Sequence, residues 1–568
     1  MPRPPSRCLG VALVALVACG GDRAADATPE WDRFVAGFLE TYFRADPLFA
    51  VYQGRHEFDG RFPDWSEAGL AAWAARLQGL RDSAAGFAIE AGDTARVFER
   101  HYVVSRIDRE LFWLERADWP HRNPEYYSGS MDPNVYLARE YAPRPDRMRS
   151  FTRYAANLPA AVVHVRANLK TPMARAYAQI GNGRFAGLAD YLETDVPGVF
   201  ASVKDSALQR EFAGANAAAV KALREVAAWF AEQEKRGNEA YAMGPELFRG
   251  MLRMTEGVEL PLDSLEARGR ADLERNVAAL RQACARYAAG RSVAECVRRS
   301  NVQKPAGGPV EAARRQLDTL EAFVRNRDIV TVVGTERALV RESPPYQRFN
   351  SAYIDIPGPY EEGLPSIYYI APPDPSWSPV EQREYIPSEG NLLFTSVHEV
   401  WPGHFLNFLH SNRVNSQFGR VFVGYAFAEG WAHYTEEMMW EAGLGEGSPE
   451  LHIGQLMNAL LRNARYISAI GLHTKGMTVA ESERIFQEQA FQDPGTARQQ
   501  ALRGTYDPAY LNYTLGKLMI LKLRADWTAS RGGQKAWKEF HDRFLSYGGP
   551  PIPLVRRAML GGAGGSVM

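Results

Sequence analysis

A proline inside a histidine motif is the feature that most limits how this chain can fold. Residues 391–411 read NLLFTSVHEVWPGHFLNFLHS, with His398 and His404 six residues apart and Pro402 between them. In an unbroken α-helix, residues at this spacing lie about 120° apart around the axis. A straight helix would therefore keep the two imidazoles on different faces.

Pro402 argues against a straight helix. It has no N–H, and its ring would clash with the carbonyl of His398 one turn earlier. It also biases Trp401 away from the α conformation, and Gly403 permits backbone geometries that other residues resist. We therefore predict a widened or broken turn around Pro402 that brings His404 back beside His398.

A second segment carries three more groups that could bind or support a metal. Residues 424–441 read GYAFAEGWAHYTEEMMWE. Glu429, His433 and Glu436 are spaced i, i+4, i+7, so a helix places them on one face. Two histidines and a glutamate that converge on one point are typical of a catalytic zinc site, which keeps a further position open for water.

These motifs resemble a known family. The His-Glu-x-x-Pro-Gly-His segment, followed by Glu-Gly-Trp-Ala, is similar to the signature of the bacterial family catalogued as domain of unknown function 885. That family is often secreted or lipid-anchored and is grouped with the gluzincin zinc peptidases. Further similar segments lie downstream, at Gly471-Leu472-His473 with Gly476 and Thr478, at Tyr513 to Lys517, and at Phe540-His541-Asp542 with Gly549 and Pro553-Leu554. The chain departs from the family at Asn407, Met477 and Ala469, where Gln, Trp and Asp are usual.

The resemblance implies a metal centre with one Zn²⁺ per chain. We expect His398, His404 and Glu429 to be the ligands. His433, one turn from Glu429, is the rival ligand if His404 points away. Otherwise His433 and Glu436 are expected to orient the ligands.

The resemblance also implies a peptidase mechanism. Glu399 is expected to act as general base on the attacking water. Tyr513 and His473 are the expected donors to the oxyanion of the tetrahedral intermediate. Arg465 or Arg524 could hold a substrate carboxylate, although a structural ion pair is the commoner role of such an arginine.

Two other classes of protein stay open. One is a non-catalytic, metal-containing surface lipoprotein that binds peptides or a protein partner. The other is a carboxylate-rich di-metal redox protein, which would need a Glu-x-x-His pair on each of two helices. Neither motif has that spacing, so the prediction is a zinc-dependent hydrolase, most simply a metallopeptidase that acts on peptides.

The N-terminus indicates export. Arg3 and Arg7 precede an apolar run at 9–18 that is too short to cross a bilayer as a helix. Leu16-Val17-Ala18-Cys19 resembles a bacterial lipobox, so we expect cleavage before Cys19 and a lipid anchor on it. Gly20 favours the periplasmic face of the outer membrane or the cell surface. A plain secretory signal with an incidental Cys19 is the alternative.

Composition adds few constraints. The 568 residues can bury a large core, and a net charge of −1 gives no indication of nucleic-acid binding. Only Cys284 and Cys296 remain after export and lipidation. In an oxidising periplasm they could pair, and two separate buried thiols are an equal alternative.

The expected fold is predominantly α. Apolar residues at helical spacing between Leu208 and Phe230, and again from Leu265 to Tyr287, predict two long helices. Residues 351–356 and 366–371 are rich in Tyr and Ile between Pro and Gly, and predict two strands. We expect two helical lobes around a cleft, with this small sheet next to the metal-binding helix. The expected division is a signal peptide at 1–19, a flexible tether at 20–29, an N-terminal helical lobe at 30–343, a metal-site lobe at 344–560 and a disordered tail at 561–568.

Overall fold

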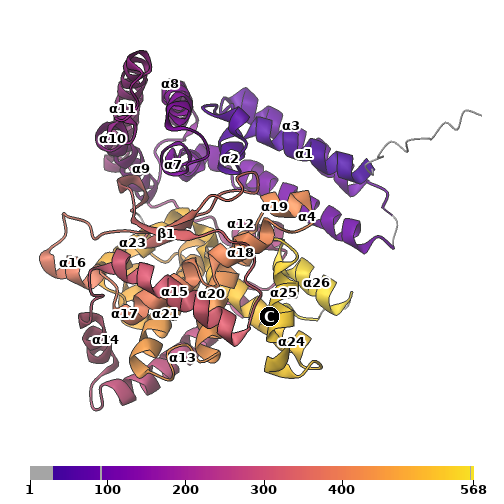
Figure 1. Ribbon diagram of the computed structural model, residues 1–568, viewed down its shortest axis with the longest axis vertical. Helices are drawn as coiled ribbons and strands as arrows, with labels where there is room; N and C mark the ends of the chain where they lie inside the picture. Colours follow the sequence, from indigo (N-terminus) through magenta and orange to yellow (C-terminus); the bar gives the residue numbers. More distant parts are fainter. Residues whose placement is uncertain (1–29, 90–91, 349, 563–564) are drawn as a thin grey trace, which may run out of the picture.

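The computed structural model describes residues 30–568 except 90, 91, 349, 563 and 564. The predicted signal peptide, Cys19 and the tether therefore lie outside the described residues. The described chain is predominantly α-helical, with one small three-stranded sheet, as the sequence predicts (Figure 1). None of the described helices is long and apolar enough to cross a membrane.

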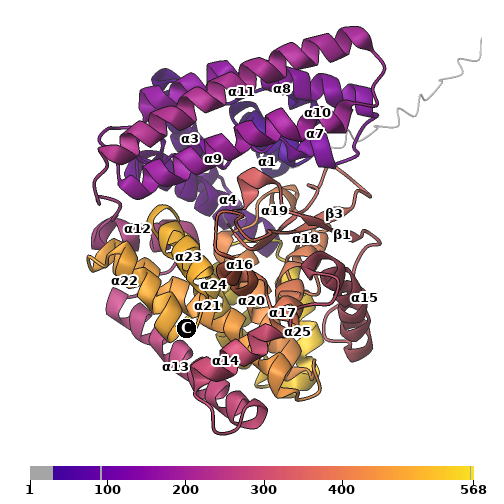
Figure 2. The ribbon, with the colours of Figure 1, turned by 90° about the vertical axis from the view of Figure 1, so that its left-hand side faces the viewer.

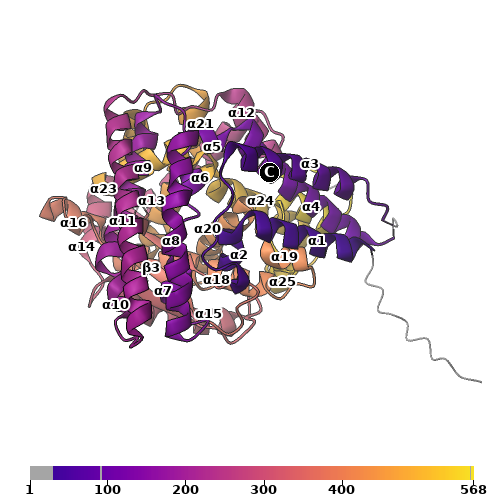
Figure 3. The ribbon, with the colours of Figure 1, turned by 90° about the horizontal axis from the view of Figure 1, so that it is seen from above.

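The N-terminal helices form one side of the molecule (Figure 2). They are α1 (Glu30–Ala45), α2 (Pro47–Tyr52), α3 (Glu67–Ala85), α4 (Thr94–Leu111), α5 (Trp119–Arg122), α6 (Glu125–Ser128), α7 (Asn134–Ala138), α8 (Arg144–Asn168), α9 (Arg175–Thr194), α10 (Val196–Phe200) and α11 (Ser206–Lys235). Helix α11 is capped by Asp205, whose carboxylate accepts hydrogen bonds from the N–H groups of Ala207 and Leu208. It runs beside α8 and α9 (Figure 3) and buries Phe212, Val226 and Phe230 there, which confirms the predicted helical spacing.

The remaining helices surround the predicted metal segment. They are α12 (Pro245–Glu256), α13 (Leu262–Tyr287), α14 (Val293–Val302), α15 (Pro309–Arg327), α16 (Pro379–Tyr385), α17 (Glu389–Glu399), α18 (His404–Ser411), α19 (Gln417–Val421), α20 (Tyr425–Glu441), α21 (Pro449–Thr474), α22 (Val479–Arg484), α23 (Pro494–Tyr506), α24 (Asn512–Thr528), α25 (Trp537–Leu545) and α26 (Ile552–Leu560). Helices α17, α20, α21 and α24 pack on one another and form the framework of the site.

The buried apolar residues form two core clusters, and they divide earlier in the chain than the expected boundary at 343. One cluster is built mainly from residues 31–241, and the other mainly from 248 onward. Helix α13 explains the difference, because it packs along α21. Tyr466 donates its hydroxyl proton to the carbonyl of Leu265 at 2.9 Å, and the amide of Asn276 bonds Asn463 at 2.7 Å. Residues 248–340 therefore share the core of the metal segment.

The sheet has the order β1-β3-β2, with β1 at Ala338–Glu342, β2 at Ala352–Asp355 and β3 at Ser366–Ile370. Strands β2 and β3 are antiparallel and confirm the two predicted strands. Strand β1 is parallel to β3 and was not predicted, because only Val340 of its five residues is buried and an exposed edge strand carries little apolar pattern. Strand β2 packs against α17 and has no strand on its outer side among the described residues.

A buried arginine ties the N-terminal helices to the sheet. Arg139, just after α7, pairs with Asp355 at 2.6 Å and with Glu361 at 2.5 Å. It also donates to the carbonyl of Tyr52 at 2.8 Å. A buried cation needs such partners to offset the loss of hydration. Because Asp355 ends β2, this network fixes the strand that borders the site.

Two details concern the expected sulfur chemistry and the tail. Cys284 and Cys296 form a disulfide with an S–S distance of 2.04 Å, which settles the open alternative in favour of pairing. Of the described residues in the tail at 561–568, Met568 is 7% exposed and belongs to the larger core cluster.

Candidate metal centre

The break around Pro402 is present and has the predicted consequence. Helix α17 ends at Glu399, the bond from Trp401 to Pro402 is cis, and α18 begins at His404. His398 thus sits in the last turn of one helix and His404 in the first turn of the next. Their ring centroids lie 4.8 Å apart, with the rings almost perpendicular.

The turn is held closed by close packing. A Cβ on Gly403 would lie 1.8 Å from the carbonyl oxygen of His398, so only glycine fits there. The Gly403 N–H donates to the carbonyl of Val397 at 3.0 Å. From α20, the indole N–H of Trp431 donates to the carbonyl of Pro402 at 2.9 Å. The motif residues around the histidines therefore shape the turn and anchor it to the neighbouring helix.

Helix α20 brings Glu429 to both histidines. Its Oε2 lies 3.3 Å from Nε2 of His398 and 3.1 Å from Nε2 of His404. One ligand atom from each of the three residues falls within 4.8 Å of the other two. The structure thus brings together the three residues that the sequence predicts as metal ligands.

The donor set fits zinc. Four ligands in tetrahedral geometry with bonds of about 2.1 Å place neighbouring ligand atoms about 3.4 Å apart, close to the two distances between imidazole nitrogens and Glu429. Two imidazoles and one carboxylate also match a common catalytic zinc site. Burial alone would raise the pKa of Glu429, but the neighbouring His404 and His398 hold it well below its usual value. The carboxylate is therefore anionic and available to a cation.

A charged chain behind His398 sets the orientation of its ring. Glu436 Oε1 lies 2.7 Å from Nδ1 of His398, and Arg462 lies 3.3 Å from the same oxygen. Burial would raise the pKa of Glu436, but the Arg462 charge keeps it well below the usual range. The carboxylate thus accepts a hydrogen bond from the Nδ1–H of His398 and leaves Nε2 of that ring with a free lone pair.

Glu399 is the next residue on α17 and is 6% exposed. Its side chain lines the same cavity as the ligand cluster. Burial raises the pKa of this carboxyl, while His398 and His404 partly offset the shift. A buried carboxylate with an elevated pKa can accept a proton from a water molecule in the cavity.

Tyr513 reaches the cluster because two helices pack without side chains between them. A Cβ on Gly430 of α20 would lie 2.5 Å from Cα of Gly516 on α24, so the two backbones touch. The Tyr513 ring consequently stacks on His398 at a centroid distance of 6.0 Å. Its hydroxyl accepts a 3.4 Å hydrogen bond from Arg503.

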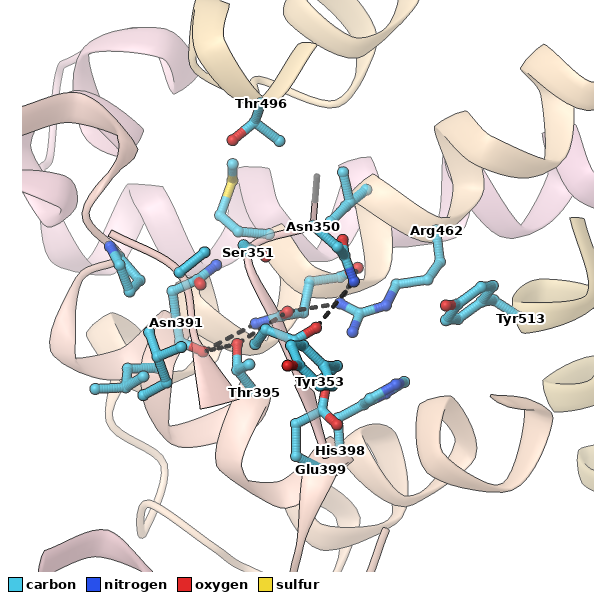
Figure 4. Close-up of a pocket in the computed structure, with 18 of the residues that line it drawn as sticks. Asn350, Ser351, Tyr353, Asn391, Thr395, His398, Glu399, Arg462, Thr496 and Tyr513 are labelled. Atoms are coloured by element: carbon cyan, nitrogen blue, oxygen red, sulfur yellow. Dashed lines mark hydrogen bonds between the residues drawn. The ribbon is translucent and has the colours of Figure 1, made fainter. Parts of the chain in front are cut away.

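The cluster opens into a cavity of about 340 Å³. Figure 4 shows part of its lining, with His398, Glu399, Arg462 and Tyr513 around the cavity. Tyr353 of β2 also borders it, together with the adjacent residues 350–354. The volume is at the low end for small-molecule sites.

His473 does not reach this cavity, which corrects one expectation. Its Nε2 donates to the carbonyl of Gly504 at 2.7 Å, and its Nδ1 accepts the N–H of Met243 at 3.3 Å. The imidazole is 1% exposed and joins α21 to α23 and to the loop before α12. Because both ring nitrogens bind backbone groups, His473 has a structural role. It is therefore not positioned to donate a hydrogen bond to an oxyanion in the cavity.

We expect His473 to lower stability in acid. Burial lowers its pKa from 6.5 to about 4 in the folded protein. Between these values only the unfolded chain binds the proton. The free energy of unfolding should therefore decrease as the pH falls below 6.5, by about 2 kcal/mol at pH 5 from this residue. Urea unfolding at pH 7, 6 and 5 should show a shallower decrease for His473→Gln, and parallel curves for variant and wild type would contradict this.

His433 lies outside the cluster of His398, His404 and Glu429. It is fully buried, does not line the cavity, and its Nδ1 lies 3.5 Å from Glu436. Burial lowers its pKa to about 4, so it is neutral at pH 7. Neither ring nitrogen has a hydrogen bond to any described residue. His433 thus packs behind the cluster, next to the glutamate that orients His398.

One participant was missed by the sequence analysis. Arg462 supplies the positive charge beside Glu436 and also lines the cavity. A signal was available, because Asn458, Arg462 and Arg465 are spaced i, i+4, i+7 and share one face of α21. The Asn458 side chain does accept a hydrogen bond from Arg462 at 2.5 Å.

The comparisons with known proteins concern family and fold. No curated protein matches the chain. Several solved chains are similar, among them these two. One, described as a predicted lipoprotein of unknown function from Shewanella oneidensis, has 23% identity and a TM-score of 0.75, and the match covers 94% of this chain and all of the other. The second, described as a predicted lipoprotein from Colwellia psychrerythraea, has 16% identity and a TM-score of 0.79, with 93% and 98% covered. A family model described as "Bacterial protein of unknown function (DUF885)" matches residues 47–559. Because that match spans most of this chain, the chain belongs to the DUF885 family of bacterial proteins of unknown function.

Proposed function

We propose that this protein is a zinc-dependent hydrolase that cleaves short peptides. The observation that carries the proposal is the convergence of His398, His404 and Glu429 at the wall of a cavity that Glu399 also lines. Three ligands and a separate buried carboxylate are the minimum equipment of a zinc peptidase.

The ligands and the base have distinct tasks. His398, His404 and Glu429 would hold the zinc ion, which supplies Lewis-acid activation of a water molecule and of the scissile carbonyl. Glu399 accepts the proton of the attacking water and delivers it to the leaving amine. The Tyr513 hydroxyl donates a hydrogen bond to the oxyanion that forms at the carbonyl. Arg503, which donates to that hydroxyl, favours its orientation toward the cavity.

Strand β2 supports an extended peptide as the substrate. Its outer side faces no other strand among the described residues, and Ala352, Tyr353 and Ile354 border the cavity. A free strand edge can bind an extended chain through main-chain hydrogen bonds. A peptide lying along β2 would pass over the ligand cluster next to it.

Metal removal tests the proposal. The purified protein should hydrolyse members of a random peptide mixture, as followed by mass spectrometry. Dialysis against a chelator should remove at least nine-tenths of the activity, about what is expected when zinc occupancy falls tenfold, and added zinc should restore it. Hydrolysis that survives complete removal of zinc would reject the proposal. Bound zinc with no hydrolysis of any peptide would favour the non-catalytic lipoprotein.

We further propose that the protein is exported and lipid-anchored, on the periplasmic face of the outer membrane or on the cell surface. The lipobox-like segment that ends at Cys19 supports this location. The Cys284–Cys296 disulfide is typical of an oxidising compartment outside the cytoplasm. The two similar structures are both described as predicted lipoproteins.

A further inference from the structure

Arg465 is a buried cation without an anionic partner in the described part of the chain. It lies on α21, is 3% exposed and lines the cavity that contains the ligand cluster. Its Nε donates to the amide oxygen of Gln500 at 2.8 Å, and its guanidinium lies 4.6 Å from the centroid of the Tyr513 ring. No described carboxylate forms an ion pair with it.

The neighbouring arginines are all paired. Arg462 faces Glu436 at 3.3 Å and Arg503 faces Asp507 at 2.9 Å. Arg524, the other arginine that the sequence suggested for carboxylate binding, is paired with Glu441 at 2.8 Å and does not line the cavity. The structural role therefore holds for Arg524 but leaves Arg465 unexplained.

A buried, unpaired guanidinium is costly unless an anion joins it. Burial indeed lowers the pKa of Arg465. The guanidinium group presents a planar fork of donors that matches a carboxylate. Since its terminal nitrogens bond no described residue, they are available to a ligand in the cavity.

The position of Arg465 relates such a ligand to the metal cluster. The Tyr513 ring contacts both the Arg465 guanidinium and the His398 ring. An extended chain advances about 3.5 Å per residue. A peptide with its scissile bond at the cluster would therefore reach Arg465 within a few residues, and the small cavity favours a short substrate.

We propose that Arg465 binds a substrate carboxylate and so selects short peptides that carry one close to the scissile bond. This inference rests on the proposed hydrolase function. The carboxylate has two possible sources, the free C-terminus of the peptide or an Asp or Glu side chain. A free C-terminus would make the enzyme a carboxypeptidase or dipeptidase.

The kinetic test uses random tripeptides prepared as free acids and as C-terminal amides. Wild-type protein should cleave the free acids at least 30-fold faster in kcat/KM, a ratio expected when a buried charge loses its partner. Arg465→Gln should remove most of this preference, chiefly through KM, and Arg465→Lys should restore part of it. Arg524→Gln is the matched control and should keep the full preference.

The amides also separate the two sources of the carboxylate. If the acid and the amide of each sequence are cleaved equally, but only sequences with Asp or Glu are cleaved fast and Arg465→Gln removes that preference, the side chain is the group that Arg465 binds. If the rate depends neither on a free C-terminus nor on Asp or Glu, Arg465 does not bind a carboxylate, although the hydrolase function stands.

Peptide binding to the zinc-free protein tests the role of Arg465 separately from catalysis. The free-acid tripeptides should raise the melting temperature of the zinc-free protein, since a ligand of the folded state stabilises it. The amides should do so much less, and Arg465→Gln should abolish the difference. Equal stabilisation by both sets, with no dependence on Asp or Glu in the peptide, would overturn the role of Arg465. If the zinc-loaded wild-type protein hydrolyses no peptide but the zinc-free protein still shows this difference between acids and amides, the role of Arg465 is supported and only the proposed function is rejected.

Discussion

Glu399→Gln should abolish peptide hydrolysis while zinc stays bound. Glutamine has nearly the same shape as glutamate but cannot accept a proton from water. A general base contributes about 10²- to 10⁴-fold to the rate, so kcat should fall by at least 100-fold with little change in KM. Glu399 lies beside the ligands without being one of them, and zinc content measured by atomic absorption should stay at the wild-type level.

The same helix provides a matched control for this prediction. Glu389 begins α17, bonds Gln316 at 3.0 Å and does not line the cavity. Glu389→Gln makes the identical chemical change and should leave kcat within about twofold, since surface substitutions alter stability by only about 0.5 kcal/mol. If Glu399→Gln retained full activity, another group would be the base. If both variants lost activity together, α17 would be sensitive to charge and the assignment to Glu399 would fail.

The ligand cluster could be predicted from the sequence because local rules determine it. Pro402 excludes a continuous helix, and the spacing of Glu429 and His433 selects one helix face. These constraints act within a few residues of the groups they place. The structure adds Trp431, whose bond to the Pro402 carbonyl fixes the turn against α20.

The location of His473 could not be predicted in the same way. Its motif resembles one that follows a metal site, but its position depends on Met243 and Gly504, which are 230 and 31 residues away. Such distant backbone partners leave no periodic signal. The packing of residues 248–340 against the metal segment could not be predicted for a similar reason, because helix α13 packs on α21, more than 150 residues later.

Arginines show a further limit of sequence reasoning. Arg465 and Arg524 both lie in helical segments, and neither segment indicates whether a carboxylate from another helix pairs with the arginine. The structure separates them, because Glu441 faces Arg524 while no described carboxylate pairs with Arg465. A pairing across helices is a tertiary property. The functional meaning of a buried charge thus emerges only when its whole surroundings are known.

His404→Ala should remove zinc from the protein, and His433→Asn should not. The sequence left both histidines open as ligands, but only Nε2 of His404 lies 3.1 Å from Glu429, while His433 packs behind Glu436. Loss of one of three protein ligands leaves too few donors for a catalytic site. After dialysis at pH 7, wild type and His433→Asn should retain about one zinc per chain. His404→Ala should retain less than about one tenth of that.

Glu436→Gln refines this comparison, because Glu436 orients a ligand without being one. Replacing such a partner typically weakens metal affinity 10- to 100-fold. A competition titration with a coloured chelator should therefore rank zinc affinity as wild type, then Glu436→Gln, then His404→Ala. The ranking depends on the 2.7 Å contact between Glu436 and His398 Nδ1. If His433→Asn lost zinc and His404→Ala kept it, the ligand set would be His398, Glu429 and His433, and the broken turn at Pro402 would serve only to shape the cavity.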